Sequence, residues 1–218
     1  MQDDVLERLM EIIGKTEETA DRRLPPEGAL SEMLGVTRGR LRTLLKRLEA
    51  EGLIWRHIGK GTFVGPKSMA PSNTKSGVSV SIDTIMSARL TLEPQLARRA
   101  AVSATSEDIK QLQSSISEMA EAKSFLVWRL HDERLHRCIA AATHNDVLLM
   151  MYDVLRGQMA SGLSDRIEAK FGPEDAPKEE SNSAHFQIVK AIVDHDPSAA
   201  ETAMRSHLLM VRQQLFDL

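Results

Sequence analysis

Residues 26–64 read PEGALSEMLGVTRGRLRTLLKRLEAEGLIWRHIGKGTFV, and this stretch decides the fold of the N-terminal third of the chain. It predicts two helices joined by a tight turn, because Gly35 interrupts the apolar pattern and Thr37 is a residue type that caps helices. Residues 53–56 and 62–64 then read as two short strands around a glycine-rich tip. The apolar residues that repeat at helical spacing are Leu30, Met33 and Leu34 in the first helix and Leu41, Leu44, Leu45 and Leu48 in the second.

The outward side of the second helix is strongly cationic. Arg38 and Arg42 are four residues apart, so they project from one side of its N-terminal half. That half of a recognition helix enters the major groove of DNA, where arginine pairs with guanine. A charge run alone is more often a solvated face, but here it coincides with a helix-turn-helix and a wing. We therefore predict that DNA is contacted by Thr37, Arg38, Arg40, Arg42, Lys46, Gly59, Lys60 and Gly61.

Residues 24–64 resemble the winged-helix domain of the GntR family of bacterial transcription regulators. The resemblance implies that Thr37, Arg38 and Arg42 contact DNA and that the tip at 59–61 enters the minor groove. The motifs that carry it are Leu24-Pro25-Pro26-Glu27, Leu34-Gly35-Val36-Thr37-Arg38, Leu41-Arg42, Leu48-Glu49-Ala50-Glu51-Gly52-Leu53 and Gly59-Lys60-Gly61-Thr62-Phe63-Val64.

This chain departs from the family pattern at one position. The family usually has a DNA-contacting arginine directly after the glutamate of its "LPSER" signature, whereas this chain has Gly28 there. One expected contact is missing, so the operator sequence is expected to differ from that of relatives. Arg22 and Arg23 are the candidates to compensate in part.

Charge and composition support a DNA-binding protein without a membrane anchor. The net charge is −3, but residues 22–60 hold nine Lys or Arg against four Asp or Glu, a net +5 that leaves −8 for the rest. No run of about 18 apolar residues marks a membrane span, and the N-terminus lacks the features of a signal peptide. Cys138 is the only cysteine, so no internal disulfide forms, which favours a cytoplasmic location.

The predicted fold class is mostly α, with an N-terminal winged helix-turn-helix domain and a C-terminal all-helical bundle. The winged domain spans 1–66 and includes a first amphipathic helix at 3–14. A Pro-, Gly- and Ser-rich linker follows at 67–81, and the helical domain fills 82–218. Its expected helices cover 82–101, 106–123, 124–142, 146–169 (with a break at Gly157 or Gly162), 179–194 and 197–216, with a loop at 171–178.

Four residues of the second half suggest a metal site. Asp132 and His136 lie four residues apart on one predicted helix and therefore face one side. His185 and His207 are equidistant from the turn at Asp196-Pro197, so an antiparallel hairpin places them at equal height. One carboxylate and three imidazoles suit Zn²⁺, Ni²⁺ or another divalent transition ion. The alternative is a set of satisfied core histidines. The remaining histidines are expected to be solvated, and these are His57, His131, His144 and His195.

Residues 82–217 resemble the all-helical FCD ligand-binding domain of the FadR subfamily. In metal-binding members an Asp and three His of the shared motifs are the ligands, which implies that Asp132, His136, His185 and His207 hold a divalent transition metal. Zn²⁺ is the first candidate, with Ni²⁺ or another ion as the alternative. Members that bind fatty acyl-CoA do not keep the histidines, so the resemblance points away from that branch. The motifs that carry it are Arg89…Glu93 with Ala100-Ala101, Asp132…Leu135-His136 followed by Ala140…Asn145…Leu148, Ser181…His185…Ile188-Val189-Lys190-Ala191-Ile192, and Asp196…Ala199-Ala200…Met204…His207-Leu208.

The resemblance also implies a small carboxylate effector. Four protein ligands leave a six-coordinate ion with room for water or an organic acid, and family members commonly sense sugar acids, lactate-like acids or dicarboxylates there. Arg89 matches the family's arginine and is the candidate to bind the carboxylate. The alternative is an exposed arginine that pairs with Glu93 at i+4. Arg134 and Arg137 lie off the face of the metal ligands and are expected to point elsewhere.

The function expected from these features is a DNA-binding transcription regulator, not an enzyme, with repression relieved by effector as the commoner family mode. It would act as a homodimer on palindromic double-stranded operator DNA, since one recognition helix reads only a few base pairs. One alternative is a metal-dependent hydrolase fused to a DNA-binding module, because an Asp/His₃ site can activate water. No further Glu, Ser or Cys stands at a spacing that marks a general base or nucleophile. Another alternative is a regulator whose metal is purely structural.

Overall fold

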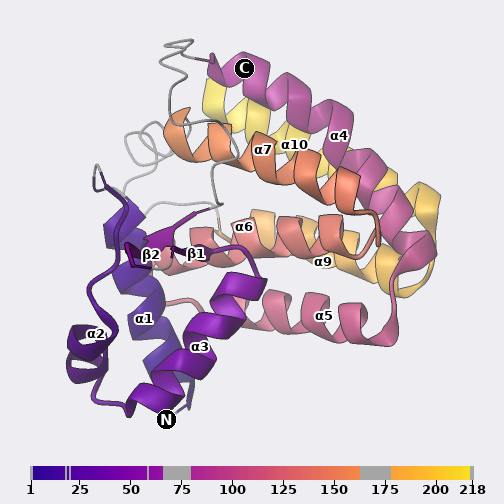
Figure 1. Ribbon diagram of the computed structural model, residues 1–218. Helices are drawn as coiled ribbons and strands as arrows, with labels where there is room; N and C mark the ends of the chain where they lie inside the picture. Colours follow the sequence, from indigo (N-terminus) through magenta and orange to yellow (C-terminus); the bar gives the residue numbers. More distant parts are fainter. Residues whose placement is uncertain are drawn as a thin grey trace.

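The computed structural model describes residues 2–17, 19, 21–57, 59–65, 80–162 and 178–216. The chain is mostly helical, as predicted, and two parts of it pack against each other (Figure 1). The first part consists of α1 (Gln2–Glu17), α2 (Glu27–Leu34), α3 (Arg38–Ala50), β1 (Ile54–His57) and β2 (Gly61–Val64). The second consists of α4 (Ile82–Ser103), α5 (Ser106–Glu121), α6 (Phe125–Ala141), α7 (Asp146–Gly162), α9 (Lys178–Val193) and α10 (Pro197–Phe216). Residues 67–79 of the predicted linker and 171–177 of the predicted loop lie outside the described residues.

The helix-turn-helix forms where its turn residues predict it. Gly35 adopts a left-handed conformation with φ 65°, which glycine reaches without steric cost, and its N–H bonds to the last carbonyls of α2. Thr37 caps α3 by accepting a hydrogen bond from the backbone N–H of Arg40 at 3.3 Å. Met33, which belongs to the apolar stripe noted for this helix, is 52% exposed because α2 turns that residue to solvent.

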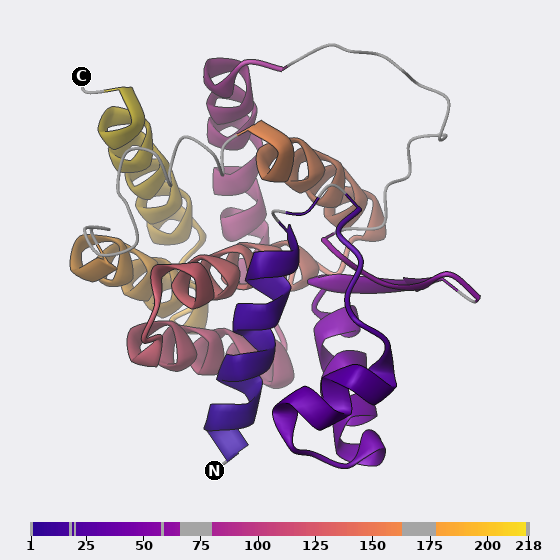
Figure 2. The same cartoon turned by 90° about the vertical axis from the view of Figure 1, so that its left-hand side faces the viewer.

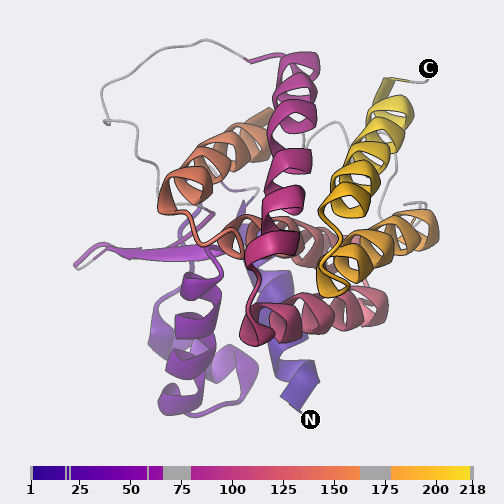
Figure 3. The same cartoon turned by 90° about the vertical axis from the view of Figure 1, so that its right-hand side faces the viewer.

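The wing is an antiparallel pair in which Ile54 lies opposite Val64 and His57 opposite Gly61. Residues 22–24 run along its other edge, since the N–H of Leu24 bonds to the carbonyl of Thr62 and the N–H of Val64 to that of Arg22. Figures 2 and 3 show the β1–β2 hairpin projecting away from the helices. The wing is therefore free to reach a partner that lies along α3.

One apolar core crosses from the winged helix into the helical part. Leucines of α1, α2 and α3 pack together with Val127 and Leu130 of α6. Helix α1 extends to Glu17, three residues beyond the predicted end, and its last residues are buried against α6. Figure 2 shows α1 lying across α6, so the winged helix is docked on the second part by a shared core.

The second part is a bundle in which α4 lies beside α10 and the α9–α10 hairpin turns at 194–196 (Figure 3). Thr105 and Asp108 form a reciprocal capping box at the start of α5. Helix α7 runs through Gly157 without interruption, so the break considered at that residue is absent. Among the described residues, no helix is both long and apolar enough to cross a membrane.

Candidate metal centre and DNA-binding face

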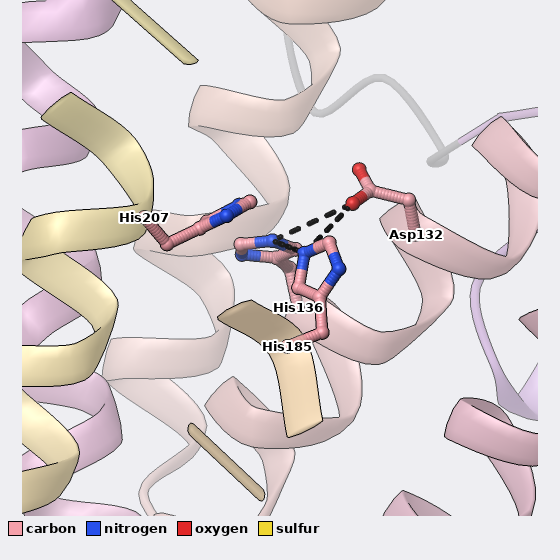
Figure 4. A group of neighbouring side chains, drawn as sticks. All are labelled: Asp132, His136, His185 and His207. Atoms are coloured by element: carbon pink, nitrogen blue, oxygen red, sulfur yellow. Dashed lines mark hydrogen bonds and ion pairs between the residues drawn. The ribbon is translucent and has the colours of Figure 1, made fainter. Parts of the chain in front are cut away.

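Three helices bring the four candidate ligands to one point inside the bundle. Asp132 and His136 lie on consecutive turns of α6, while His185 comes from α9 and His207 from α10 (Figure 4). The ring centroids of His185 and His207 are 4.2 Å apart, as expected for equal heights across the α9–α10 hairpin. One ligand atom from each of the four residues lies within 4.8 Å of all the others.

The distances show that carboxylate and imidazole atoms converge. Asp132 Oδ1 lies 3.0 Å from His185 Nε2 and 3.8 Å from His136 Nε2, and the two Nε2 atoms are 3.3 Å apart. The three histidines are almost completely buried. The Nε2 atoms of His136 and His185 therefore face each other in a site that is closed to most solvent.

The protonation states of these groups suit a divalent cation. Burial is the largest cause that lowers the pKa of both His185 and His207, so their imidazoles are neutral at pH 7 and offer lone pairs. Burial opposes ionisation of Asp132, but its hydrogen bond to His185 and the nearby histidines outweigh this and lower its pKa. A carboxylate with three imidazoles is a donor set that Zn²⁺ and similar ions accept. The residues present therefore fit a metal ion.

Glu93 contacts the ring nitrogen of His136 that faces away from the other ligands, and it was not among the predicted ligands. Its Oε2 lies 2.6 Å from His136 Nδ1, so that nitrogen donates to Glu93 and leaves Nε2 as the acceptor facing the other ligands. Burial would raise the pKa of the Glu93 carboxyl, but Arg89 and His136 prevail and lower it to about 2. The sequence placed Arg89 and Glu93 on one face of a helix, but it carried no signal that this face is buried, as the structure shows it to be.

Arg89 combines features of both interpretations considered for it. Its Nε donates to Glu93 Oε1 at 2.6 Å, as the ion-pair alternative expected, but the side chain is buried rather than exposed. Its positive charge also acts on Asp132 and His185. Arg89 therefore lies within electrostatic reach of the candidate metal centre.

The other histidines and arginines of the second part lie away from this centre. The expectation of a solvated His131 was wrong: the side chain is 5% exposed, because it faces the seam between the two parts. Burial lowers its pKa to about 4, although Glu118 opposes the shift. His144 and His195 are exposed, with His144 bonded to Asp108. Arg134 and Arg137 point toward the winged helix, as expected from their positions.

The predicted DNA-binding residues form one exposed face of the first part. Arg38 and Arg40 make no ion pair with any described residue, whereas Arg42 Nε donates to Glu27 Oε2 at 2.8 Å. Gly59 and Gly61 have φ values of 78° and 120°, which glycine adopts readily, so the tip forms a tight turn with Lys60 exposed. All members of the predicted set are exposed, namely Thr37, Arg38, Arg40, Arg42, Lys46, Gly59, Lys60 and Gly61.

The neighbours of Gly28 show what stands where the family arginine is missing. A Cβ added at Gly28 would lie 3.6 Å from Arg38 Nη2, so the recognition-helix arginine borders this position. Arg23 instead lies beside the wing, 3.0 Å from a Cβ at Gly61, and Arg22 lies near Gly65. The two arginines considered as substitutes therefore border the wing.

Comparisons with known proteins match both parts. A family model described as "Bacterial regulatory proteins, gntR family" matches residues 1–64, and an FCD domain model matches residues 84–209. The chain belongs to the GntR family. Within it, the FCD domain places the chain with the FadR-like regulators, and its relatives are transcriptional regulators rather than enzymes. The hydrolase alternative is therefore set aside.

Among the relatives of this GntR regulator, the Uxu operon transcriptional regulator of Escherichia coli (strain K12) is 31% identical, over 96% of this chain and 84% of the relative. The putative L-lactate dehydrogenase operon regulatory protein of the same organism is 30% identical, over 97% and 84%. Streptococcus agalactiae GntR has a TM-score of 0.52 at 24% identity, over 98% of this chain and 99% of that one. E. coli McbR/YncC has a TM-score of 0.57 at 17% identity, over 100% and 98%. The solved structures support the fold.

Proposed function

We propose that this DNA-binding regulator is a homodimeric repressor whose operator affinity is controlled by a small organic acid at the Asp132–His136–His185–His207 centre. The convergence of one carboxylate and three imidazoles within 4.8 Å of one another carries the proposal. A bound Zn²⁺ or similar ion supplies a Lewis-acidic centre for a carboxylate oxygen. Relatives named for the Uxu operon and for an L-lactate dehydrogenase operon favour an acid of the sugar-acid or 2-hydroxy-acid class.

Different residues of the site bind the metal ion and the organic acid. Asp132 and the three histidines hold the cation, and Glu93 fixes the tautomer of His136 through its Nδ1–H. The guanidinium of Arg89 binds the carboxylate of the organic acid, because Arg89 is buried beside the same ligands. Its ion pair with Glu93 stabilises its positive charge. Burial in the bundle strengthens each of these interactions, because water competes poorly there.

A thermal-melt screen with small organic acids tests this proposal, before and after chelation. We expect one class of acid to raise the melting temperature, an effect that chelation abolishes and Zn²⁺ restores. The same acid is expected to release labelled operator duplex in a fluorescence anisotropy titration. Stabilisation by Zn²⁺ without any response to acids would indicate the purely structural metal. No response to either would show that the four residues bind no metal.

The proposed homodimer has a candidate interface on α7. Val147, Met150, Met151 and Val154 follow an i, i+3, i+4, i+7 pattern, and their exposed fractions range from 44% to 63%. Helix α7 packs on α4 and α6, and its apolar stripe is uncovered by the rest of the described chain. A second copy related by a two-fold axis would cover the stripe with an identical one and give the recognition helices the symmetry of a palindrome.

Replacing Met151 with aspartate is expected to produce a monomer, because each interface would then bury two uncompensated carboxylates. Light scattering after size-exclusion chromatography measures the mass directly. Leu209→Asp on α10 is the matched control, since Leu209 is 50% exposed and lies off the stripe. An unchanged dimer mass for Met151→Asp, or a monomer for Leu209→Asp as well, would contradict this interface.

A further inference from the structure

Helix α6 serves two sites at once. Asp132 and His136 face the candidate metal centre. On the same helix, Arg129 pairs with Glu17 of the winged helix and with Glu133, and Arg137 donates to the carbonyl of Ala50. Asp132 and Glu133 are consecutive, so a helix that moves as a rigid unit cannot shift one without the other. The two sites are thus joined by a single element.

Glu133 is the centre of a buried charge network between the two parts. Its Oε1 accepts from Arg129 Nη1 at 2.9 Å and its Oε2 from Arg156 Nη2 at 3.3 Å. Arg129 in turn donates to Glu17 Oε2 at 2.8 Å, and Arg156 Nη1 donates to the carbonyl of Gly52 at 2.7 Å. All four charged side chains are at most 12% exposed.

Both outer ends of this network lie at places that set the orientation of the recognition helix. Gly52 is the second residue after the end of α3, and Glu17 is the last residue of α1, on which α2 and the wing pack. Glu133 thus holds the winged helix at two points through two arginines. If Glu133 shifts, both points of attachment shift with it.

Buried ion pairs suit this task better than apolar contacts would. The cost of removing charges from water cancels much of their attraction, so such a network adds little net stability compared with apolar packing. It still fixes geometry, because breaking one pair leaves an uncompensated buried charge. A junction of this kind favours one placement of the winged helix while adding little to its net binding.

We propose that Glu133 is a positioning residue through which occupancy of the metal centre sets the placement of the recognition helix. This inference rests on the proposed metal centre. When Asp132 is drawn toward a cation, Glu133 turns with it about the axis of α6, and Arg156 and Arg129 carry the change to Gly52 and Glu17. Helix α6 transmits the movement from Asp132 to Glu133, and the two arginines connect Glu133 to the winged helix.

The chain carries its own reporter for this movement. A cleft of about 500 Å³ lies between the end of α3 and helices α5 and α6, and its lining includes Arg47, Glu51, Arg134 and Cys138. Cys138 is the only cysteine of the chain. Its rate of alkylation therefore reports how far this cleft opens, without any engineered label.

The experiment compares wild type with Glu133→Gln, which keeps the size of the side chain and removes its charge. In the wild type we expect Zn²⁺ to change the alkylation rate of Cys138 by at least about threefold, since opening governs access. In Glu133→Gln we expect Zn²⁺ affinity to be retained and the alkylation rate to be independent of Zn²⁺. Glu201→Gln is the control, because Glu201 pairs with Arg98 within the helical part and touches no residue of the winged helix.

The possible outcomes separate this inference from the proposed function. Wild type that binds no Zn²⁺ overturns both. Wild type that binds Zn²⁺ with no change at Cys138, or Glu133→Gln that keeps the full change, overturns the role of Glu133 alone. If Glu133→Gln does not fold, Arg156→Lys replaces it: lysine keeps the charge beside Glu133 but lacks the fork that also reaches Gly52. Arg156→Lys is expected to uncouple Cys138 from Zn²⁺ in the same way, and a retained response overturns the inference.

Discussion

Replacing His185 with alanine is expected to remove tight Zn²⁺ binding and every response to an organic acid, while metal-free operator binding stays at the wild-type level. His185 lies fully buried between Asp132 and His136, and its Nε2 is within 3.3 Å of both. Four-ligand Zn²⁺ sites bind with about 10–16 kcal/mol, so losing one ligand of four corresponds to roughly 2.5–4 kcal/mol, or about 10²–10³-fold in affinity. Competition with a chromogenic chelator measures this change.

Glu93→Gln provides a graded comparison for the same measurement. Its amide still reaches His136 Nδ1 but loses the charge that orients the imidazole, so a reduction of about 10–100-fold is expected. Circular dichroism melts in chelator establish that each variant keeps its fold. Wild-type Zn²⁺ affinity in His185→Ala would show that the cluster is not the metal site. Loss of metal-free operator binding in the folded variant would contradict the separation of the two functions.

The features that the sequence predicted correctly depend on short-range geometry. Gly35 and Thr37 define a turn and a cap through their own backbone and hydroxyl, so their roles follow from residue type. The i, i+4 spacing of Asp132 and His136 fixes their common face on any straight helix. The equal distance of His185 and His207 from a hairpin turn brings them together whatever else the bundle contains.

The features that the sequence did not reveal depend on which face is covered by a distant element. Spacing predicted that Arg89 pairs with Glu93, but only packing of α4 against α6 and α10 buries the pair and brings Glu93 to His136. His131 is buried because the seam between the two parts closes over it. Arg156 reaches Gly52 across 104 residues of sequence, a contact without a local signal. Met33 had the spacing of a core residue, yet α2 leaves it exposed.

Replacing Arg38 with alanine is expected to cause the largest loss of operator affinity among the cations of α3. Arg38 lies in the first turn of α3, is exposed and has no ion pair among the described residues, so its guanidinium is ready to contact a base. A bidentate arginine–guanine contact is worth about 1–3 kcal/mol, and a dimer loses two, so roughly 2–6 kcal/mol, or about 30- to 10⁴-fold, is expected. Arg42→Ala is expected to cost less, because Arg42 must leave Glu27 before it binds DNA.

The measurement uses an operator selected from a random duplex pool with the wild-type protein, followed by fluorescence anisotropy at several salt concentrations. A base-reading Arg38 predicts that the variant loses affinity for the selected site far more than for random duplex. An equal loss on both duplexes would instead mean that Arg38 contacts only phosphates. Arg98→Ala is the control, since Arg98 is an exposed cation of α4 paired with Glu201. Wild-type affinity in Arg38→Ala would show that this end of α3 does not enter the groove, and the recognition surface would then have to lie on the wing, where Arg23 and Lys60 gather.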